Sequence, residues 1–188
     1  PTFRHEQYDG YKANRKGMPD ELAVQVPVMK EVLDAMNITR IEYEGYEADD
    51  LIGWLSLCGE KKGMEVVIIT GDRDSFQLIS DSTRVKLPIT RYGKTQTEEY
   101  DYTVFYDKYK VRPEQMIDVK ALMGDASDNI PGIKGIGEKT ALNLIRKFQN
   151  IENLYENIHQ VDRKSVKEKL ETGKETAFLS KKLATIKR

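Results

Sequence analysis

The sequence has little of several residue types on which common sites and scaffolds depend. Among its 188 residues there is a single cysteine, Cys58, so an internal disulfide framework is excluded and a reducing compartment is favoured. The two histidines, His5 and His159, lie far apart in sequence, which argues against a histidine-rich metal site or a histidine-based triad. No apolar run approaches the ~20 residues that a membrane span needs, and no signal peptide is present, so we expect no membrane contact. The first residue is Pro1 rather than methionine, and we expect the chain to be part of a longer protein.

A large net charge is also missing, since the formal value is −1, but the charges are unevenly spread. Residues 1–50 carry 6 basic and 11 acidic side chains, whereas residues 134–188 carry 13 basic and 7 acidic ones. A lysine-rich segment alone is usually a solvated helix face. An acidic region that can hold metal beside a basic region that can hold phosphate is a more specific combination, and it favours a nucleic-acid partner.

Apolar periodicity predicts helices that alternate with buried strands over the first two thirds of the chain. The expected strands are 38–43, 65–70, 85–89 and 94–100, and the last two flank a turn at Tyr92-Gly93. We therefore predict an α/β fold with a mostly parallel central sheet flanked by helices over residues 1–124. The remaining residues, 125–188, are expected to form a small helical subdomain.

Three clusters of carboxylates are candidate metal ligands. They lie at 45–50, before a predicted helix; at 70–74, after the predicted strand 65–70; and at 123–129, in a loop. Each cluster also has an ordinary structural explanation, because acids stabilise the first turn of a helix and Asp and Asn favour turns and caps. At this stage both interpretations stay open for every cluster.

The clusters become more informative if they converge in the fold. Two unit charges ~4 Å apart repel by about 4 kcal/mol at an effective dielectric constant of about 20, so neighbouring carboxylates require protons or cations. Oxygen-only ligands suit Mg²⁺ or Mn²⁺. Two such ions about 4 Å apart are the arrangement that cleaves phosphodiesters.

Residues 130–145 read IPGIKGIGEKTALNLI, which predicts a helix–hairpin–helix. A P-loop is rejected because Glu138 separates Gly137 from Lys139, and a dinucleotide fingerprint is rejected because Thr140 stands where it needs glycine. In a helix–hairpin–helix, apolar residues such as Ile133 anchor the hairpin, and the N–H groups at the start of the next helix bind a phosphate without reading a base. The alternative is a plain turn between two helices, with glycines that only cap them.

Several segments together resemble the 5′ nuclease domain of bacterial DNA polymerase I, a member of the flap endonuclease superfamily. They span nearly the whole chain in the family's order: FRHEQYDGYKANR, GYEADD, ITGDRDSFQL, LMGDASDNIPGIKGIGEKTA and LSKKLATIKR. The resemblance implies a 5′ nuclease fold of the PIN-like kind, with a flexible arch at about residues 8–26. It also implies a structure-specific 5′-3′ exonuclease or flap endonuclease of replication and repair that uses two or more Mg²⁺ or Mn²⁺ ions.

The resemblance assigns roles to particular residues. The metal-site acids are implied to be Glu47, Asp49, Asp50, Asp72, Asp74, Asp125 and Asp128. Lys12 and Arg15 are implied to act at the scissile phosphate. The implied DNA-binding set comprises Arg4, Tyr11 (by stacking on a base), Lys12, Arg15, Gly132, Lys134, Gly135, Gly137, Lys139 and Thr140. The hairpin carbonyls are expected to hold K⁺.

The expected partner is DNA with a 5′ flap, a 5′ end or a nick, and a polymerase domain is expected to follow in the same chain. We expect a monomer that is cytoplasmic and associated with the nucleoid. The family begins with a central strand that carries an aspartate, and a second aspartate precedes the position of Thr2. Neither lies in this sequence, so we expect this length of chain alone to bind metal poorly and to cut slowly. The alternative function is a non-catalytic module that binds duplex DNA.

Overall fold

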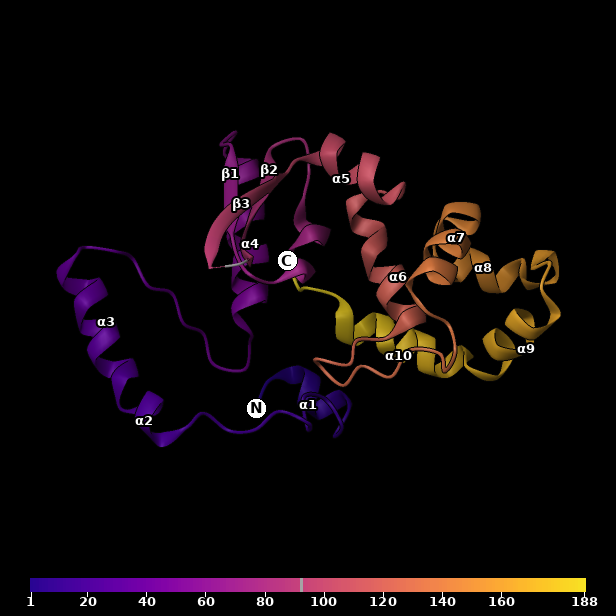
Figure 1. Ribbon diagram of the computed structural model, residues 1–188, viewed down its shortest axis with the longest axis horizontal. Helices are drawn as coiled ribbons and strands as arrows, with labels where there is room; N and C mark the ends of the chain where they lie inside the picture. Colours follow the sequence, from indigo (N-terminus) through magenta and orange to yellow (C-terminus); the bar gives the residue numbers. More distant parts are fainter. Residues whose placement is uncertain (92) are drawn as a thin grey trace.

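A computed structural model describes residues 1–91 and 93–188 and divides the chain among a small α/β unit, an exposed arm and a helical unit (Figure 1). The helices and strands of the first two parts are α1 (Phe3–Gln7), α2 (Asp20–Ala23), α3 (Gln25–Ala35), α4 (Ala48–Lys61), β1 (Val66–Ile69), η1 (Arg73–Leu78), β2 (Thr83–Arg91), β3 (Lys94–Tyr100) and α5 (Tyr102–Tyr109). Those of the helical unit are η2 (Pro113–Gln115), α6 (Met116–Met123), α7 (Glu138–Phe148), α8 (Ile151–Glu156), η3 (Ile158–Gln160), α9 (Lys164–Thr172) and α10 (Lys174–Ala184).

The three strands form one mixed sheet in the order β1-β2-β3. β1 pairs with β2 in parallel, so both strands end at the same edge. β3 pairs with β2 in antiparallel register, because the short hairpin after β2 reverses the chain direction. The predicted α/β class is confirmed, and the sheet is smaller and more mixed than expected. The hairpin is present, although Tyr92 of its predicted turn lies outside the described residues.

Residues 38–43 do not form the predicted strand. They run between α3 and α4 without a pairing partner, and Ile38 and Ile41 are about half exposed. An alternating apolar segment becomes a strand only where a neighbouring strand pairs with it, and none of the described strands does so here; the Ile38 N–H donates instead to the Leu33 carbonyl of α3 at 2.9 Å. The strand predicted at 65–70 does form, but of its core residues only Ile68 is buried, so one of its faces is open.

The arm comprises α2, α3 and the chain on either side of them, and Figure 1 shows it reaching to one side of the molecule. No residue of α3 is buried. Pro27 lies in the first turn of α3, where a missing N–H costs no helical hydrogen bond, so a new helix starts instead of a kinked one continuing. The predicted arch, residues 8–26, leads into this arm.

The helical unit is built around α6, which buries five consecutive residues and packs against α7 and α10. Its apolar core is continuous with that of the sheet through side chains such as Phe76, Phe105 and Val119. Two parts with one core hold their facing surfaces in a fixed relation, which defines the site between them. Over the described ranges, no helix has the length and apolar composition required to cross a bilayer.

Candidate functional site

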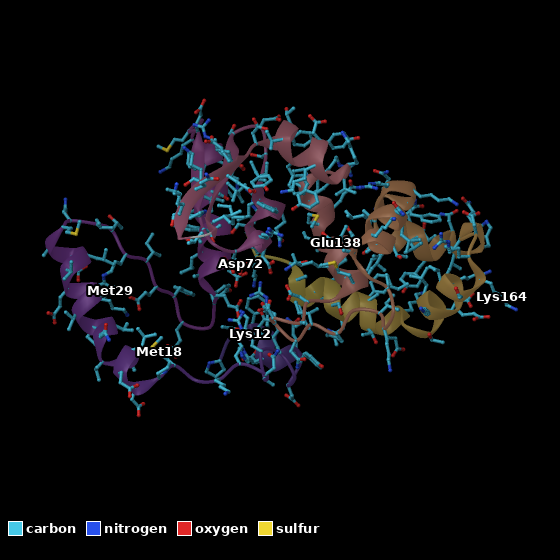
Figure 2. The ribbon with its side chains drawn as sticks, viewed as in Figure 1. Lys12, Met18, Met29, Asp72, Glu138 and Lys164 are labelled. Atoms are coloured by element: carbon cyan, nitrogen blue, oxygen red, sulfur yellow. The ribbon has the colours of Figure 1, made fainter. Side chains whose placement is uncertain are left out.

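The three acidic clusters are joined where the α/β unit meets the helical unit and the chain following α1, through contacts of Tyr11 and Lys120 with their carboxylates. Figure 2 labels Asp72 and Lys12 in this region. Glu47 caps the start of α4, and Asp49 and Asp50 lie in its first turn. Asp72 follows the carboxyl end of β1 and caps η1 by accepting a hydrogen bond from the Asp74 backbone at 2.9 Å. Both elements start at the edge of the sheet where parallel strands end, the usual place for sites in α/β folds.

The loop after α6 brings the third cluster to the same place. Asp125 and Ile130 pair as an isolated bridge, which turns the loop back on itself. Asp128 then lies against the segment that follows α1, since the Lys12 backbone donates a 2.9 Å hydrogen bond to the Asp128 carbonyl. The Tyr11 hydroxyl lies 3.1 Å from the Glu47 carboxylate and 3.2 Å from the Asp128 carboxylate. It thus joins carboxylates from segments about 80 residues apart.

Lys12 and Arg15 lie in this first half of the site, as predicted. The Lys12 ammonium is 2.8 Å from Glu47 and 3.5 Å from Asp128. Arg15 forms an ion pair with the other oxygen of Asp128, and half of its side chain remains exposed. Both cations are therefore placed at the surface of the acidic site, where an incoming phosphate would meet them.

Tyr11 has a different position from the one expected for a base-stacking residue. It is 2 % exposed, so its ring is not available to a nucleobase. Burial, together with the charges of Glu47 and Asp128, raises the pKa of its hydroxyl well above the usual value. Tyr11 therefore serves as a neutral hydrogen-bond donor that joins two carboxylates.

In the second half of the site, Lys120 lies between Asp74 and Asp125. Its ammonium donates to Asp125 at 2.6 Å and forms a close ion pair with Asp74, and Lys120 is 9 % exposed. Burial opposes ionisation of Asp125, but hydrogen bonds from Lys120 and Ser127 lower its pKa to about 2. Burial raises the pKa of Asp74, and the charges of Asp72 and Asp125 act in the same direction. Lys120 thus supplies positive charge where two carboxylates approach each other.

Asp49 and Asp72 form the part of the site without a cation. Within residues 1–91 and 93–188, neither takes part in an ion pair of the structure. Burial raises the pKa of Asp49, and the neighbouring charges of Asp72 and Glu47 raise it further. The free energy of this pair therefore falls when a cation binds between or beside them.

Asp50 and Arg4 lie behind this site instead of in it. They form a buried bidentate pair with two 2.7 Å hydrogen bonds, and their exposed fractions are 1 % and 2 %. Asp50 also accepts hydrogen bonds from the backbones of Glu47 and Lys187, so both of its oxygens are occupied. Burial opposes ionisation of Asp50, but these donors lower its pKa overall. In this structure both residues make structural contacts, and the metal-binding role of Asp50 and the DNA-binding role of Arg4 stay predictions.

A divalent cation fits the chemistry of the donors, which are all carboxylate oxygens, and two of them are left without a positive partner. The side chains as they lie do not form a ready-made cage, because no three metal-ligating groups among the described residues come close enough to hold an ion. Loading therefore requires the carboxylates to move away from Lys12 and Lys120. Asp49, Asp72 and Asp74 are the residues best placed to hold the ion.

The hairpin before α7 has the predicted shape. Ile133 and Ile136 are buried as anchors, whereas Lys134, Gly135, Gly137 and Lys139 are exposed around the start of the helix. Gly132 differs from the prediction: it is buried, and a Cβ there would lie 2.2 Å from the Gly124 backbone nitrogen. Glycine is therefore required at position 132 so that this segment can pack against the Gly124 backbone. The Gly135 carbonyl already accepts a hydrogen bond from Lys169, at 3.2 Å.

Sequence reasoning missed two residues of this region, Lys120 and Gln77. Lys120 lies among the apolar residues Val119 and Ala121–Met123 of α6 and precedes Asp125 by five residues, which is a sign in the sequence of a buried charge with a partner. Gln77 gives no such sign, because its role depends on the distant chain end at Ala184 and Ile186.

Comparison with known families identifies two models that together match the chain from end to end. Residues 1–110 match the 5′-3′ exonuclease N-terminal resolvase-like domain, and residues 111–188 match the 5′-3′ exonuclease C-terminal SAM fold. Among similar proteins is the DNA polymerase I of Bacillus subtilis (strain 168), 50 % identical over 185 residues. The match covers 98 % of this chain and 21 % of that protein, so the chain spans about a fifth of such relatives.

Solved structures agree with the sequence comparison. A T5 5′-exonuclease described with bound zinc superposes with a TM-score of 0.79 at 27 % identity, and the match covers 99 % of this chain and 70 % of that one. A T5 D15 flap endonuclease, described as a pseudo-enzyme–product complex with DNA and metal ions, gives a TM-score of 0.80 at 26 % identity. It covers 98 % of this chain and 70 % of that one.

Proposed function

The chain belongs to the 5′-3′ exonuclease family, and from that premise we propose that it hydrolyses DNA phosphodiesters at 5′ ends, nicks and 5′ flaps. The observation that supports this most is the convergence of acids from three segments on one site, with Lys12 and Arg15 at its surface. The hairpin at 132–137 lies in the same molecule and exposes the groups that grip a duplex backbone. The proposed setting is the replication and repair of DNA at the chromosome, in a protein whose polymerase follows the nuclease.

Divalent cations, Mg²⁺ or Mn²⁺, are the proposed cofactors, with Asp49, Asp72 and Asp74 as their main ligands. When bound, such an ion lowers the pKa of a water molecule and stabilises charge on a phosphate oxygen. Two or more ions are proposed because the acids of three chain segments carry more negative charge than one divalent ion would balance. K⁺ at the hairpin carbonyls is a further part of the proposal.

The chain's own residues would orient the substrate. Lys12 and Arg15 would leave their ion pairs with Glu47 and Asp128 and pair with the scissile phosphate instead. This exchange would neutralise the phosphate and free the two carboxylates. Tyr11 keeps Glu47 and Asp128 adjacent during this exchange, because its hydroxyl contacts both. Preorganised cations of this kind supply a large share of phosphoryl-transfer catalysis.

Replacing Asp72 by Asn tests the proposal. Asn caps a helix as well as Asp does, so Asp72→Asn keeps the hydrogen bond to the Asp74 backbone and changes stability by less than about 1 kcal/mol. It removes a metal-binding charge, so cleavage of a labelled 5′-flap duplex in Mg²⁺ should fall about 100-fold or more. The assay uses the protein as its gene encodes it, with the intact mass measured first.

Asp101→Asn is the matched control. Asp101 also caps a helix, by accepting from the Val104 backbone at 2.8 Å, but it lies on α5 and faces solvent. It should leave cleavage unchanged. Equal cleavage by Asp72→Asn and the unaltered protein would exclude Asp72 as a ligand.

The second candidate is a non-catalytic module that binds duplex DNA. It is favoured by the pairing of five acids with Arg4, Lys12, Arg15 and Lys120, which leaves the site without a ready-made cage. This function predicts salt-sensitive binding that Mg²⁺ does not change and no cleavage by the unaltered protein.

A further inference from the structure

The backbone that ends α10 and continues beyond it is hydrogen-bonded by side chains of α1, α4 and η1. The carbonyls of Leu183 and Thr185 accept hydrogen bonds from Arg4 at 2.9 and 2.7 Å. The Lys187 N–H donates to Asp50 at 2.9 Å. This segment, residues 183–187, is called the strap below.

Gln77 completes these contacts from η1. Its amide nitrogen donates to the Ala184 carbonyl at 3.0 Å, and its amide oxygen accepts from the Ile186 N–H at 2.9 Å. Gln77 thus both donates to and accepts from the backbone of one segment, as a neighbouring β-strand does. Gln77 is 7 % exposed, so water does not compete for either bond.

The strap also packs against α4 at close range. A Cβ on Gly53 would lie 2.7 Å from the Ile186 side chain, so only glycine permits this approach. The face of α4 that is buried here consists of Asp50, Gly53 and Ser56, and not its apolar residues. The helix is thus shaped to receive the strap.

The two elements that the strap joins carry the carboxylates of the site. Asp50, which binds the strap, follows Asp49 in α4, and its second oxygen fixes the Glu47 backbone at 3.1 Å. Gln77 shares the short η1 helix with Asp74. The strap therefore sets how far the acids of α4 lie from those of η1.

We propose that residues 183–187 position the metal-binding carboxylates, with Gln77 as the positioning residue. The proposal rests on the proposed function only in naming a divalent cation as what the carboxylates bind. It extends that function by assigning part of the site's geometry to a segment that contacts neither metal nor DNA.

Gln77→Met tests this proposal, with Gln115→Met as its matched control. Gln115 is also buried, accepts from the Arg112 backbone at 2.7 Å and donates to the Gln149 carbonyl at 2.6 Å, but none of these hydrogen bonds reaches the strap or a carboxylate of the site. Both variants should lose stability to a similar extent. Only Gln77→Met should speed amide hydrogen exchange at 72–78 and 183–187, and it should weaken Mn²⁺ binding about tenfold, as loss of an outer-shell partner does.

Gly53→Ala is the second variant, because it displaces the strap without removing a hydrogen-bonding side chain. Exchange at 72–78 that stays slow in both Gln77→Met and Gly53→Ala would overturn the proposal, as would a Mn²⁺ affinity that matches Gln115→Met. The exchange measurement needs no metal. The unaltered protein could bind no Mn²⁺ while both variants still speed amide exchange at 72–78. The proposed metal function would then fail, but the role of the strap in positioning η1 would be supported.

Discussion

Arg4 satisfies several chain segments at once because a guanidinium presents five N–H donors in a fixed plane. It bonds the Asp50 carboxylate on one side and the carbonyls of Leu183 and Thr185, at the end of α10, on another. Removing one partner of a buried ion pair leaves the other charge without compensation, which is much more costly than losing a pair in water. Asp50 would be that uncompensated charge.

Arg4→Met should therefore lower the free energy of unfolding by about 3–5 kcal/mol. The control is Arg40→Met, since Arg40 also forms a two-pronged pair, with Asp34, but in solvent. It should change stability very little. Urea denaturation of both variants measures the difference, and equal losses would contradict a buried role for Arg4.

Tyr155 provides a residue-scale prediction of pH dependence, away from the acidic site. Burial raises the pKa of its hydroxyl to about 12, and the hydroxyl donates to the Leu170 carbonyl at 3.1 Å. Between pH 10 and 12 the unfolded chain releases this proton while the folded chain keeps it, so stability falls as the pH rises.

Tyr155→Phe should flatten that fall. The measurement is the free energy of unfolding at several alkaline pH values, with Tyr106→Phe, an exposed tyrosine, as the control. Parallel pH profiles for the unaltered protein and Tyr155→Phe would show that Tyr155 ionises normally.

At the scale of elements, two glycines of the hairpin at 132–137 have different roles: one is needed for packing, and the other lies at the proposed binding surface. Gly132 has a φ of +56° and no room for a Cβ, whereas Gly137 has a negative φ and open space around it. Gly132 thus belongs to the fold, and Gly137 belongs to the surface that would face a phosphate.

Gly132→Ala should destabilise the protein by more than about 2 kcal/mol, through backbone strain and steric overlap. Gly137→Ala should change stability by less than about 1 kcal/mol. It should nevertheless weaken binding to a duplex, because its methyl group separates the first-turn N–H groups of α7 from the phosphate. Thermal unfolding and duplex titration at fixed salt distinguish the two, and unchanged duplex affinity in Gly137→Ala would contradict the proposed contact.

The elements also show what could be predicted from sequence. The helical character of residues 125–188 and the anchor Ile133 follow from local periodicity and turn chemistry, and both were predicted. The buried face of α4 was not, because its apolar Trp54 is half exposed and its polar Asp50 is buried. Asp50 is buried there because Arg4 and the strap, which are distant in sequence, pack against it. Apolar periodicity within a helix gives no information on such distant partners.

The same limit applied to the site. The convergence of acids could be anticipated, because strand ends in α/β folds meet at one edge. Which acids would be occupied by the chain's own cations could not, since Lys120 reaches Asp74 only through the packing of α6. Tyr11 and Arg4 were assigned to DNA binding by resemblance alone, and periodicity gave no sign that both side chains would be buried.

At the scale of the molecule, the arm and the helical unit differ most in burial. α3 buries no residue, whereas α6 buries five consecutive ones. Local stability follows burial, so amide hydrogens of α2 and α3 should exchange orders of magnitude faster than those of α6. Hydrogen-exchange mass spectrometry of the free protein measures this, and comparable protection in α3 and α6 would show that the arm packs in solution.

The ammonium of Lys120 lies where two carboxylates meet, and this has a consequence for the life of the protein in a cell. Because the side chain of Lys120 neutralises these carboxylates, the chain can fold in the absence of a divalent cation. The fold at this point therefore does not depend on a bound metal ion. Under the proposed function, loading an ion becomes a substitution of one cation for another, so the proposed activity would respond to the free concentration of the divalent cation.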